Sequence, residues 1–277
     1  MIINEVEEKI YEISPDDISE IDAAPNAEPI DCRDLNAMIH ANILKNCKKI
    51  ILHNVCGQRF IGAALQGDLE IIINGIPGND LGIFMDGPKI TVNGNCEDQV
   101  GNTMNQGSMI INGDGGDVIG LSARGGTIYI KGDVGYRVGI HMKEYENKFP
   151  IIIIGGTAKD FLGEYMAGGI IIVLGLKFLP DGSVVDTGQP ICGNELGTGI
   201  HRGSIYLRTD EKLEEKLGVG AKIVEYGEKE KEEIVSFLYQ YCKTFHIPFD
   251  MVINKQFQVV RPISKRPYRG TYCSKMI

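Results

Sequence analysis

A short pattern recurs through the middle of this sequence and constrains the fold more than any other feature. Each copy has an anchor glycine that follows an aliphatic residue, and a Leu, Met or Ala lies three positions after it. A weaker seventh copy begins at Leu196-Gly197, and Ile50 to Asn54 resembles the last strand of an incomplete earlier copy. The other six anchors, spaced by 20, 19, 19, 19 and 24 residues, are Gly62, Gly82, Gly101, Gly120, Gly139 and Gly163. A repeat of this length is typical of solenoid proteins.

The repeat predicts a parallel β-helix. Each copy holds short alternating or apolar runs and tight turns, with no helix-length pattern, whereas the crossover of a βαβ unit needs a dozen or more residues. One copy cannot bury its apolar face alone, but copies stacked at ~4.8 Å pair their strands with those above and below. We therefore expect an all-β solenoid, a single-stranded right-handed parallel β-helix of about seven coils, with flanking α-helices at the N- and C-terminal ends.

Equivalent positions of the copies would form columns along such a stack. The aliphatic and Met columns would fill the lumen, because Met adapts to irregular spaces. Most glycines between Gly62 and Gly175 fall into three columns, where we expect positive φ angles at corners that a Cβ would obstruct. Asn74, Asn93 and Asn112 share a further column and predict a ladder of stacked side-chain amides.

The extent of the repeat divides the chain into three parts. Residues 1–49 would form an N-terminal extension and capping helix, 50–209 the parallel β-helix, and 210–277 a C-terminal helix and extended tail. Amphipathic helices are predicted from Asp34 to Cys47 and from Glu230 to Phe245, since apolar residues recur there on one helical face. Both would pack near the ends of the solenoid, where strand edges need cover. The tail from Arg261 to Ile277 is expected to be extended.

Charge and composition exclude several classes of function. There are 28 Lys and Arg against 37 Asp and Glu, so the net charge is −9, and we expect no nucleic-acid or membrane partner. The seven cysteines match no zinc or iron–sulfur spacing, which predicts free thiols and a cytoplasmic protein. No signal peptide is expected at the N-terminus. The most apolar runs, Ile151 to Ile154 and Ile170 to Leu176, are too short to span a bilayer and predict buried strands.

No catalytic constellation can be assembled from the sequence. The glycines fit neither a dinucleotide-binding nor a P-loop motif. Asp98, Asp117 and Asp160 each precede an anchor by three residues and could hold a cation, but turn formation through their own backbone is the favoured interpretation. His141 and His201 lie at different positions of the repeat, and we expect satisfied or solvated imidazoles. We therefore expect no catalytic, cofactor-binding or metal-ligating residue on this chain.

One copy of the repeat is longer than the others. The interval after Gly139 is 24 residues instead of 19, and the excess forms a charged segment with two aromatic residues. Insertions on one face of a repeat often carry binding, although a tolerated insertion is an equal alternative. The segment from Lys177 to Glu195 is a second insertion of this kind. The candidate partner-contact loop consists of Lys143, Glu144, Tyr145, Glu146, Lys148 and Phe149.

These columns resemble the G-x-G-x-G repeat domain at the C-terminal end of the large subunit of glutamate synthase. The stretch from Gly163 to Gly175 reads GEYMAGGIIIVLG and is similar to that family's E-Y-M-T-G-G-x-V-V-V-L-G. Residues 50–209 carry the resemblance. Formylmethanofuran dehydrogenase contains a β-helical subunit with a related repeat, but the longer pattern that begins at Asn54 looks more like the glutamate synthase domain encoded as its own polypeptide.

The resemblance implies a non-catalytic structural subunit (domain 3) of a split glutamate synthase, which makes glutamate from glutamine and 2-oxoglutarate. Its partners would be separate glutaminase-type and FMN-synthase-type subunits, with FMN and an iron–sulfur cluster on those partners and no cofactor on this chain. Self-association and the choice of NADPH or ferredoxin as electron donor stay open. The alternatives are a scaffold like the β-helical subunit of formylmethanofuran dehydrogenase and an independent β-helix enzyme acting on polysaccharide.

Overall fold

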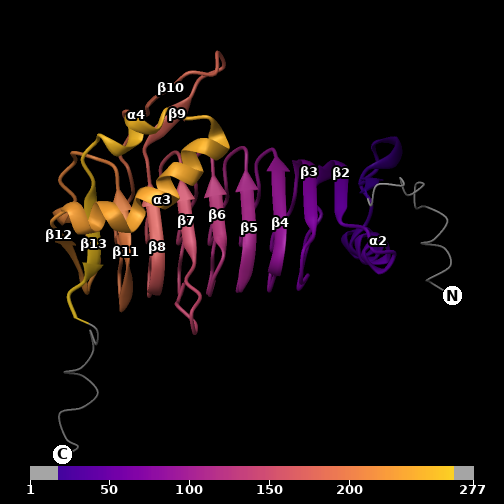
Figure 1. Cartoon of the computed structure of the whole chain (residues 1–277), viewed down its shortest axis with the longest axis horizontal. Helices are drawn as coiled ribbons and strands as arrows, with labels where there is room; N and C mark the ends of the chain where they lie inside the picture. Colours follow the sequence, from indigo (N-terminus) through magenta and orange to yellow (C-terminus); the bar gives the residue numbers. More distant parts are fainter. Residues whose placement is uncertain (1–17, 265–277) are drawn as a thin grey trace, which may run out of the picture.

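A computed structural model of the chain describes residues 18–264 and contains one long stack of parallel strands (Figure 1). Each strand pairs with its equivalent one repeat later, as in the series Ile71, Ile90, Met109 and Ile128. The predicted parallel β-helix is therefore confirmed. In order along the stack, the parallel strands are β1 (Ile18–Asp22), β2 (Lys49–Cys56), β3 (Glu70–Ile76), β4 (Asp86–Asn93), β5 (Gln106–Ile111), β6 (Thr127–Ile130), β7 (Ile151–Ile154), β8 (Ala167–Val173) and β11 (Arg202–Leu207).

The anchor glycines mark one corner of every turn. From Gly62 to Gly197 their φ angles lie between 65° and 74°. The N–H of Gly82 donates to the carbonyl of Ile61 at 2.8 Å, and the same bond recurs up to Gly197 and Leu162. Seven such corners enclose a solenoid of about six turns.

Two different contacts require glycine at the corners. At the anchors, a Cβ would enter the lumen: at Gly120 it would lie 2.4 Å from Cδ1 of Ile152. In the column that contains Gly94, a Cβ would instead lie 2.4 Å from the carbonyl oxygen of Gly75 in the preceding turn. The lumen itself is filled by the aliphatic and Met columns, which are buried throughout, so the predicted inward ladders are confirmed.

Polar ladders join successive turns. The predicted amide ladder is confirmed: Nδ2 of Asn93 donates to Oδ1 of Asn74 at 2.8 Å, and Nδ2 of Asn112 donates to Oδ1 of Asn93 at 3.0 Å. The interpretation of the aspartates as local turn formers is wrong. Oδ1 of Asp117, for example, accepts from the N–H of Tyr136 in the next turn at 2.8 Å. These carboxylates therefore connect successive turns instead of closing a local one.

Helix α2 (Cys32–Leu44) lies at the N-terminal end of the stack, as predicted (Figure 1). The Asp31 side chain caps it by accepting from the N–H of Arg33 at 2.9 Å. Leu35, Met38 and Ile39 are buried against the first turns of the solenoid. A short 3-10 turn, η1 (Pro25–Ala27), precedes it.

Helix α3 (Glu228–Phe245) follows the repeats in the sequence, as predicted. It lies across the outer face of the solenoid, however, and not near its end (Figure 1). Its apolar stripe packs on β6, β7, β8 and β11, so β7 is buried on both faces. The fully buried Tyr241 donates its hydroxyl to the carbonyl of Ile130 at 2.7 Å. This cover explains the continuous apolar runs, which are confirmed as buried strands.

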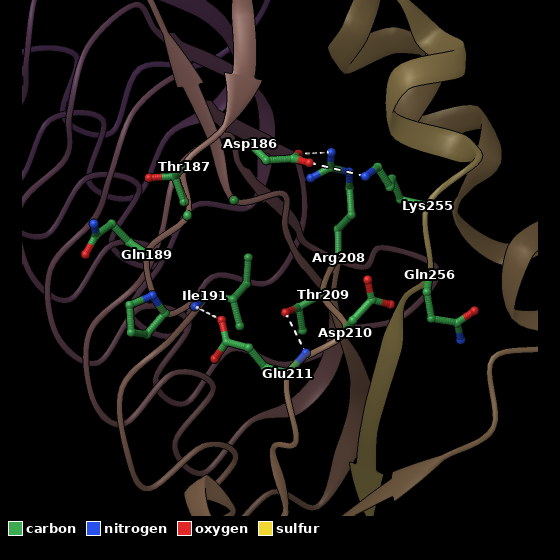
Figure 2. A pocket seen from close by; sticks show the side chains of 13 residues that line it. Asp186, Thr187, Gln189, Ile191, Arg208, Thr209, Asp210, Glu211, Lys255 and Gln256 are labelled. Atoms are coloured by element: carbon green, nitrogen blue, oxygen red, sulfur yellow. Dashed lines mark hydrogen bonds and ion pairs between the residues drawn. The ribbon is translucent and has the colours of Figure 1, made fainter.

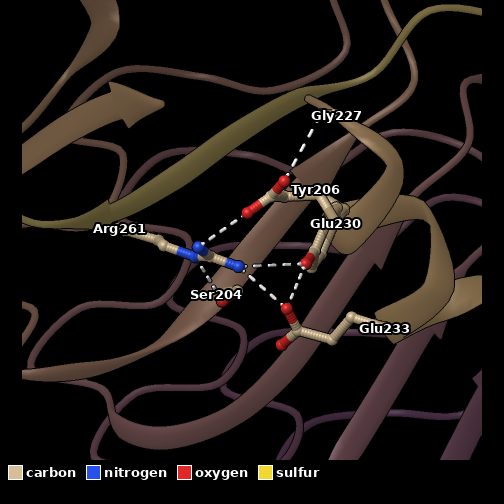
Figure 3. A network of polar contacts seen from close by, with 6 residues as sticks. All are labelled: Ser204, Tyr206, Gly227, Glu230, Glu233 and Arg261. Carbon is tan, nitrogen blue, oxygen red and sulfur yellow. Dashed lines mark hydrogen bonds and ion pairs between the residues drawn. The ribbon is translucent and has the colours of Figure 1, made fainter. Parts of the chain in front are cut away.

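An ionic network fastens the start of α3 to the sheet (Figure 3). Arg261 pairs with Glu230 at 3.0 Å and with Glu233 at 2.8 Å, and its Nε donates to Oγ of Ser204 at 3.1 Å. The Tyr206 hydroxyl donates to Glu233 at 2.8 Å. Arg261 thus holds the helix against two strands at once, and this contact connects residues about thirty positions or more apart.

The C-terminal part contains elements that the sequence did not predict. Strands β13 (Gln258–Pro262) and β12 (Ala221–Val224) extend the main sheet in antiparallel orientation after β11. The predicted extended tail begins inside β13, and its part from residue 265 onward lies outside the described residues. The insertion after β8 forms a hairpin of β9 (Leu176–Phe178) and β10 (Val184–Asp186). The remaining short elements are η2 (Glu214–Lys216) and α4 (Phe249–Ile253). No helix in residues 18–264 is long and apolar enough to cross a membrane.

Candidate functional site

The contact loop, Lys143 to Phe149, projects from the solenoid before β7 (Figure 1). Its tip is a tight turn in which Tyr145 and Lys148 exchange two backbone hydrogen bonds of 3.0 Å. Glu146, inside this turn, has a φ angle of 55°. Tyr145 is 49% exposed, so the tip presents an aromatic ring to solvent on a constrained backbone.

Several side chains of the contact loop are held by the rest of the protein. Phe149 packs edge-on against Phe237 of α3, with ring centroids 6.0 Å apart. Nζ of Lys148 lies 3.5 Å from Asp86, and Glu144 accepts from the N–H of Gly169 at 3.3 Å. Of the predicted contact residues, Lys143, Tyr145 and Glu146 are therefore the most available to a partner.

A cavity of about 470 Å³ opens beside this loop. Two columns of the repeat form it: Ser122, His141 and Tyr165 lie two positions after their anchors, whereas the other residues lie four positions after theirs. Four successive turns contribute, so the cavity runs along the axis of the stack. We call it the basic cavity, and its lining consists of Ser122, Arg124, His141, Lys143, Tyr165, Ala167 and His201.

The cations of the basic cavity have no counter-charge in the described residues. Neither Arg124 nor Lys143 forms an ion pair there, and no carboxylate lines the cavity. The guanidinium of Arg124 lies over the Tyr145 ring, 5.9 Å from its centroid, and its Nε is buried without a hydrogen-bond partner. In a chain of net charge −9, these two cations without an ion-pair partner mark a site for negative charge.

One wall of the basic cavity is an aromatic stack. The rings of His141 and Tyr165 are 5.4 Å apart and inclined by 11°. Tyr165 also lies against Gly199, where any side chain would displace it because a Cβ would come 2.4 Å from the ring. The neighbouring Glu164 is buried and pairs with Arg137, so this carboxylate is neutralised away from the cavity.

A second cavity, of about 440 Å³, lies between the β9–β10 hairpin and the C-terminal strands (Figure 2). Arg208 is buried there and pairs with Asp186, which also lies 3.3 Å from Nζ of Lys255. Burial raises the pKa of Asp186, but the hydrogen bond and charge of Arg208 and the nearby Lys255 outweigh it, so the net shift is downward. The charges of this cavity thus largely satisfy one another and hold the hairpin in place.

Metal-ligating and thiol side chains do not gather into a site in the part of the chain that the structure describes. In residues 18–264 no three His, Cys, Asp or Glu side chains lie close enough together to hold a metal ion. None of the described cysteines forms a disulfide. Burial raises the pKa of the Cys96 and Cys192 thiols to about 12, which makes them poor nucleophiles.

The sequence missed the basic cavity because each column was considered by itself. His141 and His201 belong to different columns of the repeat, yet both line the same cavity. The signal was present: the column four positions after the anchors changes from Asp86 and Asn105 to Arg124 and Lys143. This change from acidic or neutral to basic residues along one column, next to the column of His141 and Tyr165, indicates a basic surface.

Fold and surface together define a parallel β-solenoid whose turns are closed by glycine corners, with a helix across the outer face. The chain belongs to the GXGXG motif family, which matches residues 33–263. An uncharacterized protein of Methanocaldococcus jannaschii is 51% identical over 253 residues, covering 89% of this chain and 95% of that protein. The glycine-repeat resemblance is thus confirmed.

The structural comparison leads to the same fold. A chain of the formyltransferase/hydrolase complex from Methylorubrum extorquens, solved in complex with methylofuran, matches with a TM-score of 0.54 and 20% identity. The match covers 76% of this chain and 72% of that chain. At this identity the likeness establishes a shared fold. The matched chain from Methylorubrum extorquens is part of a complex.

Proposed function

We propose that this chain is a non-catalytic structural subunit of a split glutamate synthase. Membership of the GXGXG family and the GEYM stretch from Gly163 support this role. The observation that carries the proposal is the position of that stretch. Met166 fills the lumen and Glu164 pairs with Arg137, but Tyr165 is exposed beside the basic cavity and the contact loop.

The partners in this proposal are separate glutaminase-type and FMN-synthase-type polypeptides. FMN and the iron–sulfur cluster belong to those partners, and the assembly is cytoplasmic. The rigid stack suits such a role, because a solenoid presents binding residues at fixed intervals along its axis. The contact loop and Tyr165 provide exposed aromatic rings, which are favoured at the centre of protein interfaces.

Co-purification tests the proposal. The full chain, carrying an affinity tag, is co-expressed with the glutaminase-type and FMN-synthase-type polypeptides encoded in the same genome. We expect all three to elute together, and glutamine-dependent glutamate formation to exceed that of the two partners alone. A chain that elutes without either polypeptide refutes the proposal.

A matched pair of surface variants locates the contact. Tyr145→Ser removes an aromatic ring that is 49% exposed on the contact loop, whereas Val185→Ser removes an apolar side chain that is 39% exposed on the β9–β10 hairpin. We expect only Tyr145→Ser to weaken co-elution. If both variants co-elute with the partners to the same extent, the interface does not include the contact loop.

The second candidate is a scaffold like the β-helical subunit of formylmethanofuran dehydrogenase. It is favoured by one observation, the shared fold with a chain of a formyltransferase/hydrolase complex. The same tagged chain tests it: capture of molybdenum or tungsten formylmethanofuran dehydrogenase polypeptides, without the glutaminase-type polypeptide, would select this candidate.

A further inference from the structure

We propose that the basic cavity is a binding site for a small oxyanion, a carboxylate or a phosphate. The site consists of Arg124 and Lys143 as cations, with the hydroxyl of Ser122 and the imidazoles of His141 and His201 on the same lining. The inference concerns the isolated chain and does not depend on the assembly proposed above.

The first argument is the uncompensated charge. Arg124 and Lys143 occupy the same column in consecutive turns, and strands of a stack are ~4.8 Å apart. The two like charges therefore lie on neighbouring turns and repel each other, and none of the described carboxylates forms an ion pair with either of them. An anion between them replaces the repulsion by two charge-assisted hydrogen bonds.

The second argument is the state of the Arg124 side chain. Its guanidinium is held over the Tyr145 ring, and its buried Nε lacks a partner. A buried N–H without an acceptor is costly and rare in native proteins, where an ion or a water molecule commonly satisfies it. The planar guanidinium can give two parallel hydrogen bonds to a carboxylate or a phosphate.

The third argument is shape. Ala167 occupies the same column between Lys143 and His201, and its small side chain leaves the space open between them. Gly199 lets the Tyr165 ring lie back against the wall. The volume of about 470 Å³ falls within the range of ligand pockets, roughly 300–1,000 Å³. The cavity is therefore large enough for a small ion or diacid.

Isothermal titration calorimetry on the full chain tests the site with two probes, inorganic phosphate and succinate, at constant ionic strength. We expect one saturable site for at least one probe. Tighter binding of succinate assigns the ligand to the carboxylates, and tighter binding of phosphate assigns it to the phosphates. Absence of saturable binding for both probes refutes the site.

Three variants and one control make the test specific. Arg124→Gln and Lys143→Gln should each weaken binding roughly tenfold or more, because each removes a charge-assisted hydrogen bond. Ala167→Phe should abolish binding with no change of charge. Lys159→Gln removes the same charge from an exposed side chain of another column and should leave the affinity within about twofold.

Variant integrity is checked by thermal unfolding followed by circular dichroism. Lys143 is exposed, so Lys143→Gln supplies a folded variant even if Arg124→Gln fails to fold. If Lys159→Gln weakens binding as much as Lys143→Gln, the effect is one of overall charge and the proposed site is refuted.

Discussion

The glycine corners make a prediction that can be worked out from distances. In Gly94→Ala, the new Cβ would lie 2.4 Å from the carbonyl oxygen of Gly75, whereas real Cβ atoms essentially never approach closer than 3.0 Å. The two turns must therefore separate locally by about 0.6 Å. The neighbouring hydrogen bond between the side-chain amides of Asn93 and Asn74, now 2.8 Å, would lengthen beyond good hydrogen-bond geometry.

The expected cost has two parts. Overpacking at a rigid contact costs about 1–3 kcal/mol, and loss of one hydrogen bond costs about 1 kcal/mol. Gly94→Ala should therefore lower the free energy of unfolding by about 2–4 kcal/mol. The control is Gly67→Ala, where φ is 80° and nothing lies within 4 Å of the Cβ. Only left-handed strain applies there, about 1–2 kcal/mol.

Urea unfolding followed by circular dichroism measures both variants against the wild type. The steric argument requires Gly94→Ala to be clearly less stable than Gly67→Ala, because only the first forces two backbones apart. If Gly67→Ala is as destabilised as Gly94→Ala, backbone strain is the dominant cost and the reasoning about close approach of turns is wrong.

Four further predictions concern the contacts around the stack. Tyr241→Phe should lower the unfolding free energy by about 0.5–1.5 kcal/mol in urea titrations, because the carbonyl of Ile130 loses one of its two donors and keeps the N–H of Gly155; an unchanged midpoint would contradict this. Asp117→Ala should cost about 1 kcal/mol by the same measurement, whereas Asp117→Asn keeps the acceptor for Tyr136 and should cost less. The hydrogen bond from Lys49, followed by that from Lys89, holds the pKa of Glu70 below its usual 4.5, so its contribution is fully present above that pH and is lost as the pH falls through the lower folded value. The stability gap between wild type and Glu70→Gln should accordingly narrow in acid, and a constant gap would exclude the ion pairs as its cause. Finally, Ellman's reagent should modify the exposed Cys56 in the native chain well before Cys96 or Cys192, whose thiols are buried and have pKa values raised to about 12; simultaneous labelling would show that the turns open readily.

The solenoid was predictable because its main contacts join residues one repeat apart. A constant interval between Ile71, Ile90 and Met109 means that equivalent residues meet in register, so periodicity alone specifies strand pairing. The amide ladder followed from the same logic. The interpretation of the aspartates failed because it assigned them an N–H donor in their own turn, whereas the donor lies in the next turn.

The C-terminal part was predicted less well. The amphipathic pattern of α3 was correct, but its apolar stripe could cover either an end or a face of the solenoid. The short strands β12 and β13 carry little periodicity of their own, since they complete a sheet whose other strands come from the repeat. Because α3 and α4 lie between β12 and β13 in the sequence, the pairing of these two strands depends on how the helices pack and where they return the chain to the sheet.

Taken by itself, the sequence determined the stack, its register, the lumen and the glycine corners, because these are set by nearest-neighbour contacts between equivalent positions. Tertiary structure alone decided two things. It placed α3 over β6, β7, β8 and β11, through contacts such as that between Tyr241 and Ile130, 111 residues apart. It also folded the contact loop so that the Tyr145 ring lies against the guanidinium of Arg124, 5.9 Å from the ring centroid. Both depend on which outward-facing side chains meet across the surface of the stack, and a one-dimensional period does not specify that meeting.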